Sequence, residues 1–246
     1  MNDSSIHTSE TRFAFEGASM RLYVARPKTP PRASVLMLGA IWSVTPHIED
    51  VCRQLAQQGF GAIAPCLFRG ANIPARDAAP DVLVRTFVEF DDPRCIRDLR
   101  AVARAAAEGQ FGFAPGALVP WGFCLGGRFA HYLGAVSEHV AGVINFYGRL
   151  RFERQPIKPF LPAEVTDLIE VPYLGQFAET DALIPLADVE ELRAMLAARG
   201  VRHRVDVYRG ARHSFFDPTR PADHHPEASR AAWAAAVEFL HSVSAA

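Results

Sequence analysis

One heptapeptide, WGFCLGG at residues 121–127, constrains the fold of this 246-residue chain more than any other segment. It follows an apolar stretch, 117–120, that is typical of a buried strand, and it opens a segment with apolar residues at helical spacing. Glycines two residues before and after a nucleophile are typical of a sharp strand-to-helix turn, because side chains there would collide with neighbouring backbone. Between Gly122 and Gly126 stands Cys124 rather than the usual serine. The pattern therefore predicts a cysteine nucleophile on this turn.

Composition narrows the class of protein. The chain is 49% hydrophobic, which suffices for one large core. Its formal net charge is -1, so it has no general electrostatic attraction to nucleic acid or to anionic membranes. We therefore expect neither partner. No apolar run reaches the length of a membrane span, and the N-terminus lacks the basic and apolar regions of a signal peptide. Four cysteines without C-x-x-C spacing fit a reducing compartment, so we expect a cytoplasmic protein.

The order of strand and helix patterns predicts the architecture. Residues 1–10 are polar and are expected to be disordered, while 11–246 are expected to form a single domain that begins with an antiparallel hairpin over 11–27. Beyond the hairpin, strand and helix patterns alternate. The predicted strands cover 34–38, 60–65, 117–120, 140–147, 171–177 and 202–208, and the predicted helices cover 46–58, 92–108, 125–133, 187–199 and 226–241. Alternation of this kind predicts an α/β fold with a mostly parallel sheet and helices on both faces.

Two long connections, 68–90 and 149–170, interrupt the alternation with prolines, charges and weak periodicity. Long connections in compact α/β domains are usually functional, and both should lie near the carboxyl ends of strands, where such folds bind ligands. The second connection carries a basic group at 149, 151, 154 and 158. That group is either a solvated face or a contact for an anionic substrate.

Two polar residues follow the cysteine turn in the order that a catalytic triad requires. Asp181 comes after strand 171–177 and His213 after strand 202–208, where catalytic groups of such folds lie. The thiol needs a histidine to take its proton, and the histidine needs an acid to hold its tautomer. Glu179 is the alternative acid, and turn or loop roles are the alternatives for Asp181 and His213. The start of the helix after Cys124 should also favour the thiolate.

These blocks resemble the dienelactone hydrolase family of α/β-hydrolases. The resemblance rests on 122–127, on 47–51 with 59–60, on 145–148, on 180–181 and on 213–215, and it spans about residues 11 to 242. It implies the α/β-hydrolase fold with an N-terminal antiparallel hairpin. It also implies a carboxylic ester hydrolase with Cys124, His213 and Asp181 as its triad, a small ester or lactone as substrate, and no cofactor.

Several positions depart from the family pattern. Founding members carry a glutamate after the first buried strand that contacts the resting cysteine, and this chain has Ala40 there. They use an arginine four residues after the catalytic histidine to bind the substrate carboxylate, and this chain has Asp217. The position of a second such arginine falls near Pro80, and Arg85 lies a few residues further along the chain. Cys66 stands where family members have an aspartate. The resemblance therefore implies the fold and the nucleophile, but only weak activity on dienelactones.

Other candidate residues have less specific signals. The candidates for substrate contacts are Ala40, Trp42, Arg85, Phe123, Tyr147, Arg149 and Phe215. We expect Cys52, Cys66 and Cys95 to lie in the core. The pair at 224–225, two histidines, lacks a further ligand at metal spacing, so we expect a solvated loop there and no metal. We expect a monomer or a homodimer.

The predicted chemistry is hydrolysis of activated esters. Cys124 attacks a carbonyl carbon, and the N–H groups of Leu125 and Ile41 hold the oxyanion. Because a thiolate leaves more easily than an alkoxide, enol lactones, aryl esters and thioesters should react well and simple alkyl esters poorly. The alternative is a non-catalytic ligand-binding or regulatory protein on the same scaffold. The absence of the family glutamate at Ala40 motivates this alternative. No Gly-x-Ser-x-Gly exists in the chain, which argues against a serine nucleophile.

Overall fold

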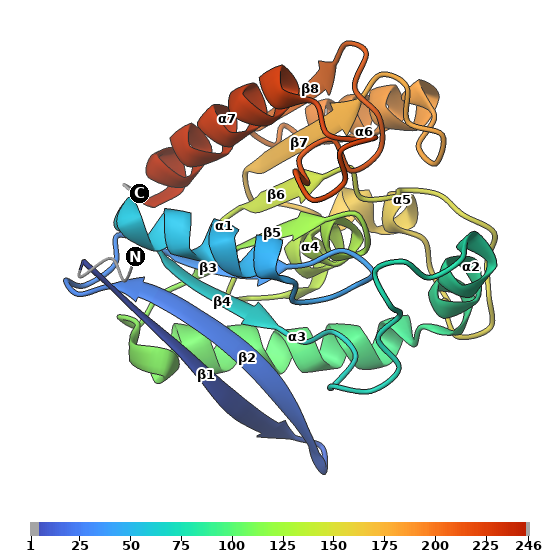
Figure 1. Ribbon diagram of the computed structural model, residues 1–246. Helices are drawn as coiled ribbons and strands as arrows, with labels where there is room; N and C mark the ends of the chain where they lie inside the picture. The colour runs from blue at the N-terminus through green and yellow to red at the C-terminus, as the bar shows by residue number, and fades with distance from the viewer. Residues whose placement is uncertain (1–4, 245–246) are drawn as a thin grey trace.

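The computed structural model describes residues 5–244, which form one eight-stranded sheet with helices on both faces (Figure 1). The strands lie in the order β1-β2-β4-β3-β5-β6-β7-β8. Their bounds are β1 Ile6–Phe15, β2 Ala18–Pro27, β3 Ser34–Leu38, β4 Gly61–Pro65, β5 Leu118–Phe123, β6 Val143–Phe146, β7 Tyr173–Ala178 and β8 His203–Tyr208. β2 pairs antiparallel with β1 and with β4, and the other strand pairings are parallel. The predicted mostly parallel sheet with an N-terminal hairpin is confirmed.

The α-helices of the described chain are α1 Pro46–Gln57, α2 Pro80–Glu89, α3 Asp92–Ala107, α4 Leu125–Val136, α5 Pro162–Val165, α6 Leu186–Ala198 and α7 Pro226–Ser244. Two short 3-10 turns, Gln110–Gly112 and Thr166–Leu168, follow α3 and α5. α1 and α7 lie on one face of the sheet, and α3 and α4 lie on the other (Figure 1). Within residues 5–244, no helix is long and apolar enough to cross a membrane.

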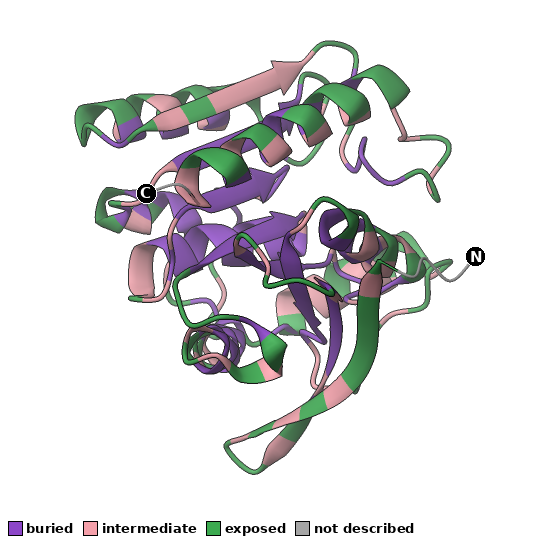
Figure 2. Cartoon of the chain, turned by 90° about the vertical axis from the view of Figure 1, so that its left-hand side faces the viewer, coloured by how far each residue is buried: buried purple, intermediate pink, exposed green. Residues whose placement is uncertain are grey.

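The central strands β3 to β7 form the core of the molecule. All their residues are buried, and they appear as a continuous purple block in Figure 2. A parallel sheet covered on both faces needs apolar side chains on both sides of each strand, which explains the unbroken apolar runs in the sequence. The carboxyl ends of parallel strands meet at one edge, so the loops after β3, β5, β7 and β8 come together there.

The N-terminal strand differs from the expected disorder of residues 1–10. β1 begins at Ile6 and pairs with β2 along its whole length, from Ile6 opposite Pro27 to Phe15 opposite Ala18. Glu10 of β1 accepts a hydrogen bond from Nε of Arg21 at 3.0 Å. An antiparallel pair can expose one face to solvent, so a polar stretch can form a strand without an apolar pattern. Residues 1–4 lie outside the described residues.

Capping side chains mark the start of two of the predicted helices. The Thr45 hydroxyl accepts the N–H of Ile48 at 3.4 Å, with Pro46 at the first helical position of α1. Asp91 accepts the N–H of Arg94 at 2.9 Å at the start of α3. These side chains satisfy backbone donors that the first turn of a helix leaves unpaired. The two capping side chains therefore define the first residues of α1 and α3.

Helix α2 lies in the connection 68–90, where the sequence pattern predicts no element. None of its residues is buried, and Val84 is 62% exposed. α2 is a short amphipathic helix that does not pack on the sheet, and the prolines and charges around it conceal it in the sequence. Its Leu83 and Phe87 line the cavity described below.

The connection 149–170 packs against α4 through hydrogen bonds. His131 of α4 is fully buried, and its Nε2 lies 2.9 Å from the carbonyl oxygen of Pro162. The hydroxyl of Tyr132 donates to the carbonyl of Phe160 at 2.9 Å. These contacts hold the connection against the helix that follows Cys124. Lys158 of the same connection is buried and contacts Phe90 and Asp92, whereas Arg151 and Arg154 form surface ion pairs with Glu191 and Glu164.

Candidate active site

Cys124 lies on the predicted sharp turn between β5 and α4. Its backbone φ is 53°, a left-handed conformation that is strained for a residue with a side chain. A methyl group at Gly122 would sit 2.0 Å from the carbonyl oxygen of Gly126, and one at Gly126 would sit 2.1 Å from the carbonyl oxygen of Leu38. Only glycine fits at both positions. The close approach of these backbones lets the turn present its cysteine at the edge of the sheet.

His213 and Asp181 lie next to each other at this edge, in the loops after β8 and β7. Nδ1 of His213 is 2.7 Å from Oδ2 of Asp181, and Oδ1 of the same carboxylate accepts the N–H of Leu183 at 2.8 Å. Glu179, the alternative acid, is exposed and accepts the N–H of Gly210 at 2.8 Å instead. The structure therefore places Asp181, and not Glu179, behind the imidazole.

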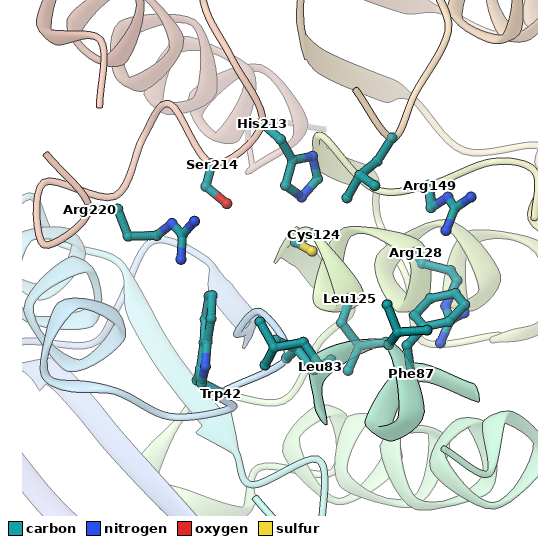
Figure 3. A pocket seen from close by; sticks show the side chains of 13 residues that line it. Trp42, Leu83, Phe87, Cys124, Leu125, Arg128, Arg149, His213, Ser214 and Arg220 are labelled. Atoms are coloured by element: carbon teal, nitrogen blue, oxygen red, sulfur yellow. The ribbon is translucent and has the colours of Figure 1, made fainter. Parts of the chain in front are cut away.

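The other ring nitrogen of His213 faces the cysteine. Nε2 is buried and has no hydrogen-bond partner within residues 5–244, and the ring points toward the sulfur of Cys124 (Figure 3). An imidazole held by a carboxylate at Nδ1 and open at Nε2 can exchange a proton with a thiol beside it. Cys124, His213 and Asp181 thus have the arrangement that a nucleophile, its base and an orienting acid require.

Electrostatics in this group favour the ion pair of thiolate and imidazolium. Burial opposes ionisation of Cys124, but the adjacent His213 and the backbone N–H of Leu125 outweigh it and lower the pKa of the thiol. Burial likewise opposes the charged form of His213, but the Cys124 sulfur and the Asp181 carboxylate raise the pKa of the imidazole to about 10. By contrast, burial raises the pKa of the Cys52 and Cys95 thiols more than the nearby arginines lower it, and both residues lie in the core as predicted.

The two expected oxyanion donors line the same cavity as the cysteine. Leu125 begins α4, and Ile41 lies in the turn after β3. That turn is closed by the N–H of Ser43, which donates to the carbonyl of Ala40 at 2.7 Å. A methyl group at Gly39 would sit 2.0 Å from the carbonyl oxygen of Ser43, so the turn also depends on glycine. The backbone is thus folded tightly on both sides of the sulfur.

A cavity of about 260 Å³ opens in front of Cys124. Most of its wall is apolar and comes from Ile41, Trp42, Leu83, Phe87, Leu125 and Leu183. Its arginines stand at the two ends, with Arg220 beside Trp42 at one end and Arg128 and Arg149 at the other (Figure 3). The cavity therefore suits a small, largely apolar molecule with its reactive carbonyl near the middle.

The remaining substrate candidates fall into three groups. Trp42 and Arg149 line the cavity in front of Cys124. Ala40, Phe123 and Tyr147 line a small neighbouring cavity of about 20 Å³. The other two line neither cavity: Phe215 is fully buried and packs on the Tyr147 ring at 5.2 Å between centroids, and Arg85 is exposed on α2.

Asp217 stands at the position of a family arginine, and both of its carboxylate oxygens accept hydrogen bonds from neighbouring residues. One oxygen accepts from Arg76 at 3.0 Å, and the other accepts the N–H of Thr219 at 2.9 Å. Burial favours the neutral acid, but Thr219, His47 and Arg76 together lower the pKa of the carboxyl group. The guanidinium of Arg76 also stacks over Trp42 at 4.5 Å from the ring centroid. Asp217 thus helps to hold Trp42 in place.

Sequence patterns miss three features of the site. One is the cavity wall from α2. Another is the half-buried His47, whose Nε2 atom is buried and has no hydrogen-bond partner within residues 5–244. The third is Arg128, which is 1% exposed and lines the cavity one helical turn beyond Cys124. An arginine in an apolar helix, four residues after a nucleophile, is the only signal that the sequence holds for it. No group of three or more side chains in residues 5–244 could hold a metal ion.

Comparisons with known proteins agree with this architecture. Residues 20–244 match the Dienelactone hydrolase family. A Yersinia pestis protein named "Putative carboxymethylenebutenolidase" is 31% identical, covering 98% of this chain and 91% of that protein. A protein of the same name from Escherichia coli K12 is 30% identical, covering 97% and 88%. The crystal structure of a "Putative Dienelactone Hydrolase" from Klebsiella pneumoniae has a TM-score of 0.89 and 31% identity, covering 97% of this chain and 99% of that one.

The sequence match runs from within β2 to the end of α7, and the structural match covers 97% of this chain. Both therefore cover the elements that carry Cys124, Asp181 and His213. The chain belongs to the dienelactone hydrolase family and is a hydrolase with the α/β-hydrolase fold.

Proposed function

We propose that this protein hydrolyses activated carboxylic esters, namely enol lactones, aryl esters or thioesters, with Cys124 as nucleophile, His213 as base and Asp181 as orienting acid. One observation carries the proposal. Nδ1 of His213 is held at 2.7 Å by Asp181 while its other nitrogen faces the Cys124 thiol at the mouth of an apolar cavity. The similarity to proteins named carboxymethylenebutenolidase supports a lactone or a related ester as the substrate class.

The first half of the reaction acylates the cysteine. The thiolate of Cys124 attacks the carbonyl carbon, and the oxyanion that forms is held by the N–H groups of Leu125 and Ile41. The intermediate collapses with cleavage of the bond to the leaving group. His213, an imidazolium in the resting ion pair, gives its Nε2 proton to the departing oxygen or sulfur. The products of this half are a thioester on Cys124 and a neutral His213.

The second half releases the acid. Neutral His213 takes a proton from water as the oxygen attacks the thioester carbonyl, and the same N–H groups hold the second oxyanion. Collapse breaks the carbon–sulfur bond and returns the electron pair to Cys124. The carboxylic acid leaves, and the thiolate and the imidazolium are restored. Throughout, Asp181 keeps the Nδ1 proton in place.

The leaving group limits the substrates. In the first tetrahedral intermediate the thiolate competes with the alcohol oxygen, and it is the better leaving group against a simple alkoxide. An alkyl ester would therefore mostly return to starting material. Enolates, phenolates and thiolates leave readily enough for the reaction to go forward.

The test is turnover of a matched set of esters by purified protein and by its Cys124→Ala variant. We expect measurable hydrolysis of an enol lactone, an aryl ester and a thioester, little hydrolysis of the ethyl ester of the same acid, and none by the variant. Trapping of the acyl group on Cys124 by mass spectrometry would support the order of steps. If no ester is turned over although the thiol reacts with alkylating agents, the scaffold serves as a ligand-binding protein instead.

We also infer a reducing compartment such as the cytoplasm. All four cysteines are free. Three of them are buried in the core, and Cys124 is needed as a thiolate for the proposed reaction. Oxidising surroundings would threaten that thiolate.

A further inference from the structure

Helix α2 turns its apolar face to the cavity instead of the sheet. None of its residues is buried, and the helix lies at one edge of the sheet, apart from the helices that cover the two faces (Figure 1). Phe87 follows Leu83 by four residues and Val84 by three, so the three side chains share one side of the helix. All three line the cavity in front of Cys124, as Figure 3 shows for Leu83 and Phe87. The apolar face of α2 is therefore directed at the thiol.

This helix lacks the packing that normally stabilises a short helix. Isolated helices of fewer than about 12 residues are marginal in water, and most helical stability in proteins comes from the burial of an apolar face. α2 has 10 residues, buries none of them and has no side chain that caps its first turn. Phe87 meets the ring of Phe152 at 5.3 Å between centroids, whereas Val84 is 62% exposed. A ligand that covers the open part of the face would supply the missing packing.

Two exposed apolar side chains form the mouth of this cavity. Val84 is the most exposed large apolar residue within residues 5–244, and Leu183 is 43% exposed. Both line the same cavity as Cys124, yet they come from separate elements, α2 and the loop after Asp181. Single exposed apolar residues are ordinary, but exposed apolar residues that meet at the rim of a cavity are typical of a ligand-binding groove. The apolar wall thus continues from the thiol to the surface of the molecule.

We propose that the substrate ester carries an apolar chain that leaves the cavity over Val84 and Leu183 and completes the packing of α2. The inference rests on the proposed function for the word substrate, and it adds the class of ester: one whose alkyl chain extends beyond the small molecule that the cavity encloses. The occupant follows from continuity, because one apolar wall joins Cys124 to both exposed side chains. Two side chains are far fewer than the roughly 20 residues a side of a stable protein interface, so the mouth fits a chain better than a partner protein.

The kinetic test compares esters that differ only in chain length, each used below its critical micelle concentration. One pair, 4-nitrophenyl butanoate and 4-nitrophenyl octanoate, places the chain on the acyl side of the carbonyl. The other pair, S-butyl and S-octyl thioacetate, places it on the leaving group. Burial of a methylene favours binding by about fourfold, or by about twofold where half of its surface stays in water. Four added methylenes should therefore raise kcat/KM by about 10- to 20-fold in at least one pair.

Polar substitutions at the mouth should remove this preference for the long chain. Val84→Ser and Leu183→Ser should each lower it by about two- to fourfold, which corresponds to one or two methylenes that lose contact, and the double variant should nearly abolish it. Both side chains are exposed, so neither variant opens a hole in the core. Leu168→Ser is the matched control, because Leu168 is 58% exposed but does not line the cavity, and it should keep the preference. A general effect of Leu183→Ser on the neighbouring Asp181 cancels in the ratio within each pair.

A binding test does not depend on turnover. N-octylacetamide should bind to the Cys124→Ala protein more tightly than N-butylacetamide by a similar factor, as measured by calorimetry. The octyl amide should also slow hydrogen exchange of the backbone amides of α2, since covering the apolar face stabilises the helix. The butyl amide at equal occupancy should protect α2 less. Adding Val84→Ser and Leu183→Ser should remove both differences.

The outcomes separate the two proposals. Tighter binding of the octyl amide that depends on Val84 and Leu183, with no turnover of any ester, would support the apolar mouth and remove the esterase. Turnover with equal kcat/KM within both pairs, and equal binding of the two amides, would overturn the apolar mouth and leave the esterase in place. A preference for long chains that survives in the double variant would also overturn it, because the chain would then lie elsewhere.

Discussion

Nδ1 of His213 lies 2.7 Å from Oδ2 of Asp181, and the opposite side of the same ring faces Cys124. The three residues follow three different strands of the parallel sheet, and the common direction of these strands brings them to one edge. The contact between His213 and Asp181 fixes which ring nitrogen carries the proton. It therefore determines that Nε2 is the atom available to the thiol.

The nucleophile can be tested by two substitutions. Cys124→Ala should reduce hydrolysis of an activated aryl ester by about 10⁴-fold or more, since loss of a triad nucleophile removes covalent catalysis. Cys124→Ser should also be poor, because a serine hydroxyl needs a stronger base than a pair tuned for a thiol. Steady-state kinetics on both variants, with far-UV circular dichroism as a check on folding, measures this. Activity above a few per cent in the alanine variant would assign the nucleophile elsewhere.

The base and the acid can each be tested by one substitution. His213→Ala should cost about as much as the loss of Cys124, because triad members act as a unit. Asp181→Asn should cost about 10⁴-fold by analogy with serine triads, since the amide favours the wrong tautomer of His213. Glu179→Gln is the matched control, because Glu179 is exposed and accepts only the N–H of Gly210 on this edge. A severe loss in Glu179→Gln with a mild one in Asp181→Asn would exchange the two assignments.

The turn at Cys124 predicts an effect on stability. Gly126→Ala would place a methyl group 2.1 Å from the carbonyl oxygen of Leu38, so β3 and α4 would have to separate. We expect a loss of about 3 kcal/mol or more in the free energy of unfolding. Gly200→Ala, where φ is 68° and no atom lies within 4 Å, should cost only about 1 kcal/mol. Urea denaturation compares the two, and equal losses would mean that the turn can relax.

Parts of the fold that are marked by residues close together in the chain can be predicted from the sequence. The turn at Cys124 is marked by two glycines, and Asp181 and His213 each follow a strand with a continuous or alternating apolar run. These signals depend on neighbours in the chain. They are strong because a parallel sheet buried on both faces tolerates few polar residues.

The wall of the cavity depends on contacts between distant residues, so no local pattern predicts it. Arg128 owes its place to Asp92, which is 36 residues away, and to rings from α2 and the connection 149–170. α2 buries no residue, and it faces the cavity rather than the sheet. β1 extends back to Ile6 because it pairs with β2, although its own sequence is polar. In each case tertiary contacts outweigh the local signal.

The last prediction concerns the resting state of the thiol. Because the pKa of Cys124 is lowered and that of His213 is raised to about 10, the thiolate and the imidazolium should coexist at neutral pH. We therefore expect fast alkylation by iodoacetamide at pH 7, with a rate that falls only at a pH well below the ordinary range of a thiol. Low concentrations of peroxide should inactivate the protein, and early loss should be reversed by added thiols. An apparent pKa near the free value of about 8.5 would contradict an activated thiolate.

Ala40 offers a way to shift this resting state by a single charge. It follows Gly39, whose carbonyl oxygen would lie 2.6 Å from a methyl group at Gly126, so the side chain at position 40 belongs to the surroundings of the turn. A carboxylate there disfavours a nearby thiolate by like-charge repulsion and should raise the pKa of Cys124. Ala40→Glu should consequently slow alkylation at pH 7 and protect against peroxide, while Ala40→Gln, of the same size but neutral, should do neither. If the glutamate and glutamine variants are alkylated at the same rate, the charge at position 40 does not control the thiolate, and the resting state depends on His213 and the start of α4 alone.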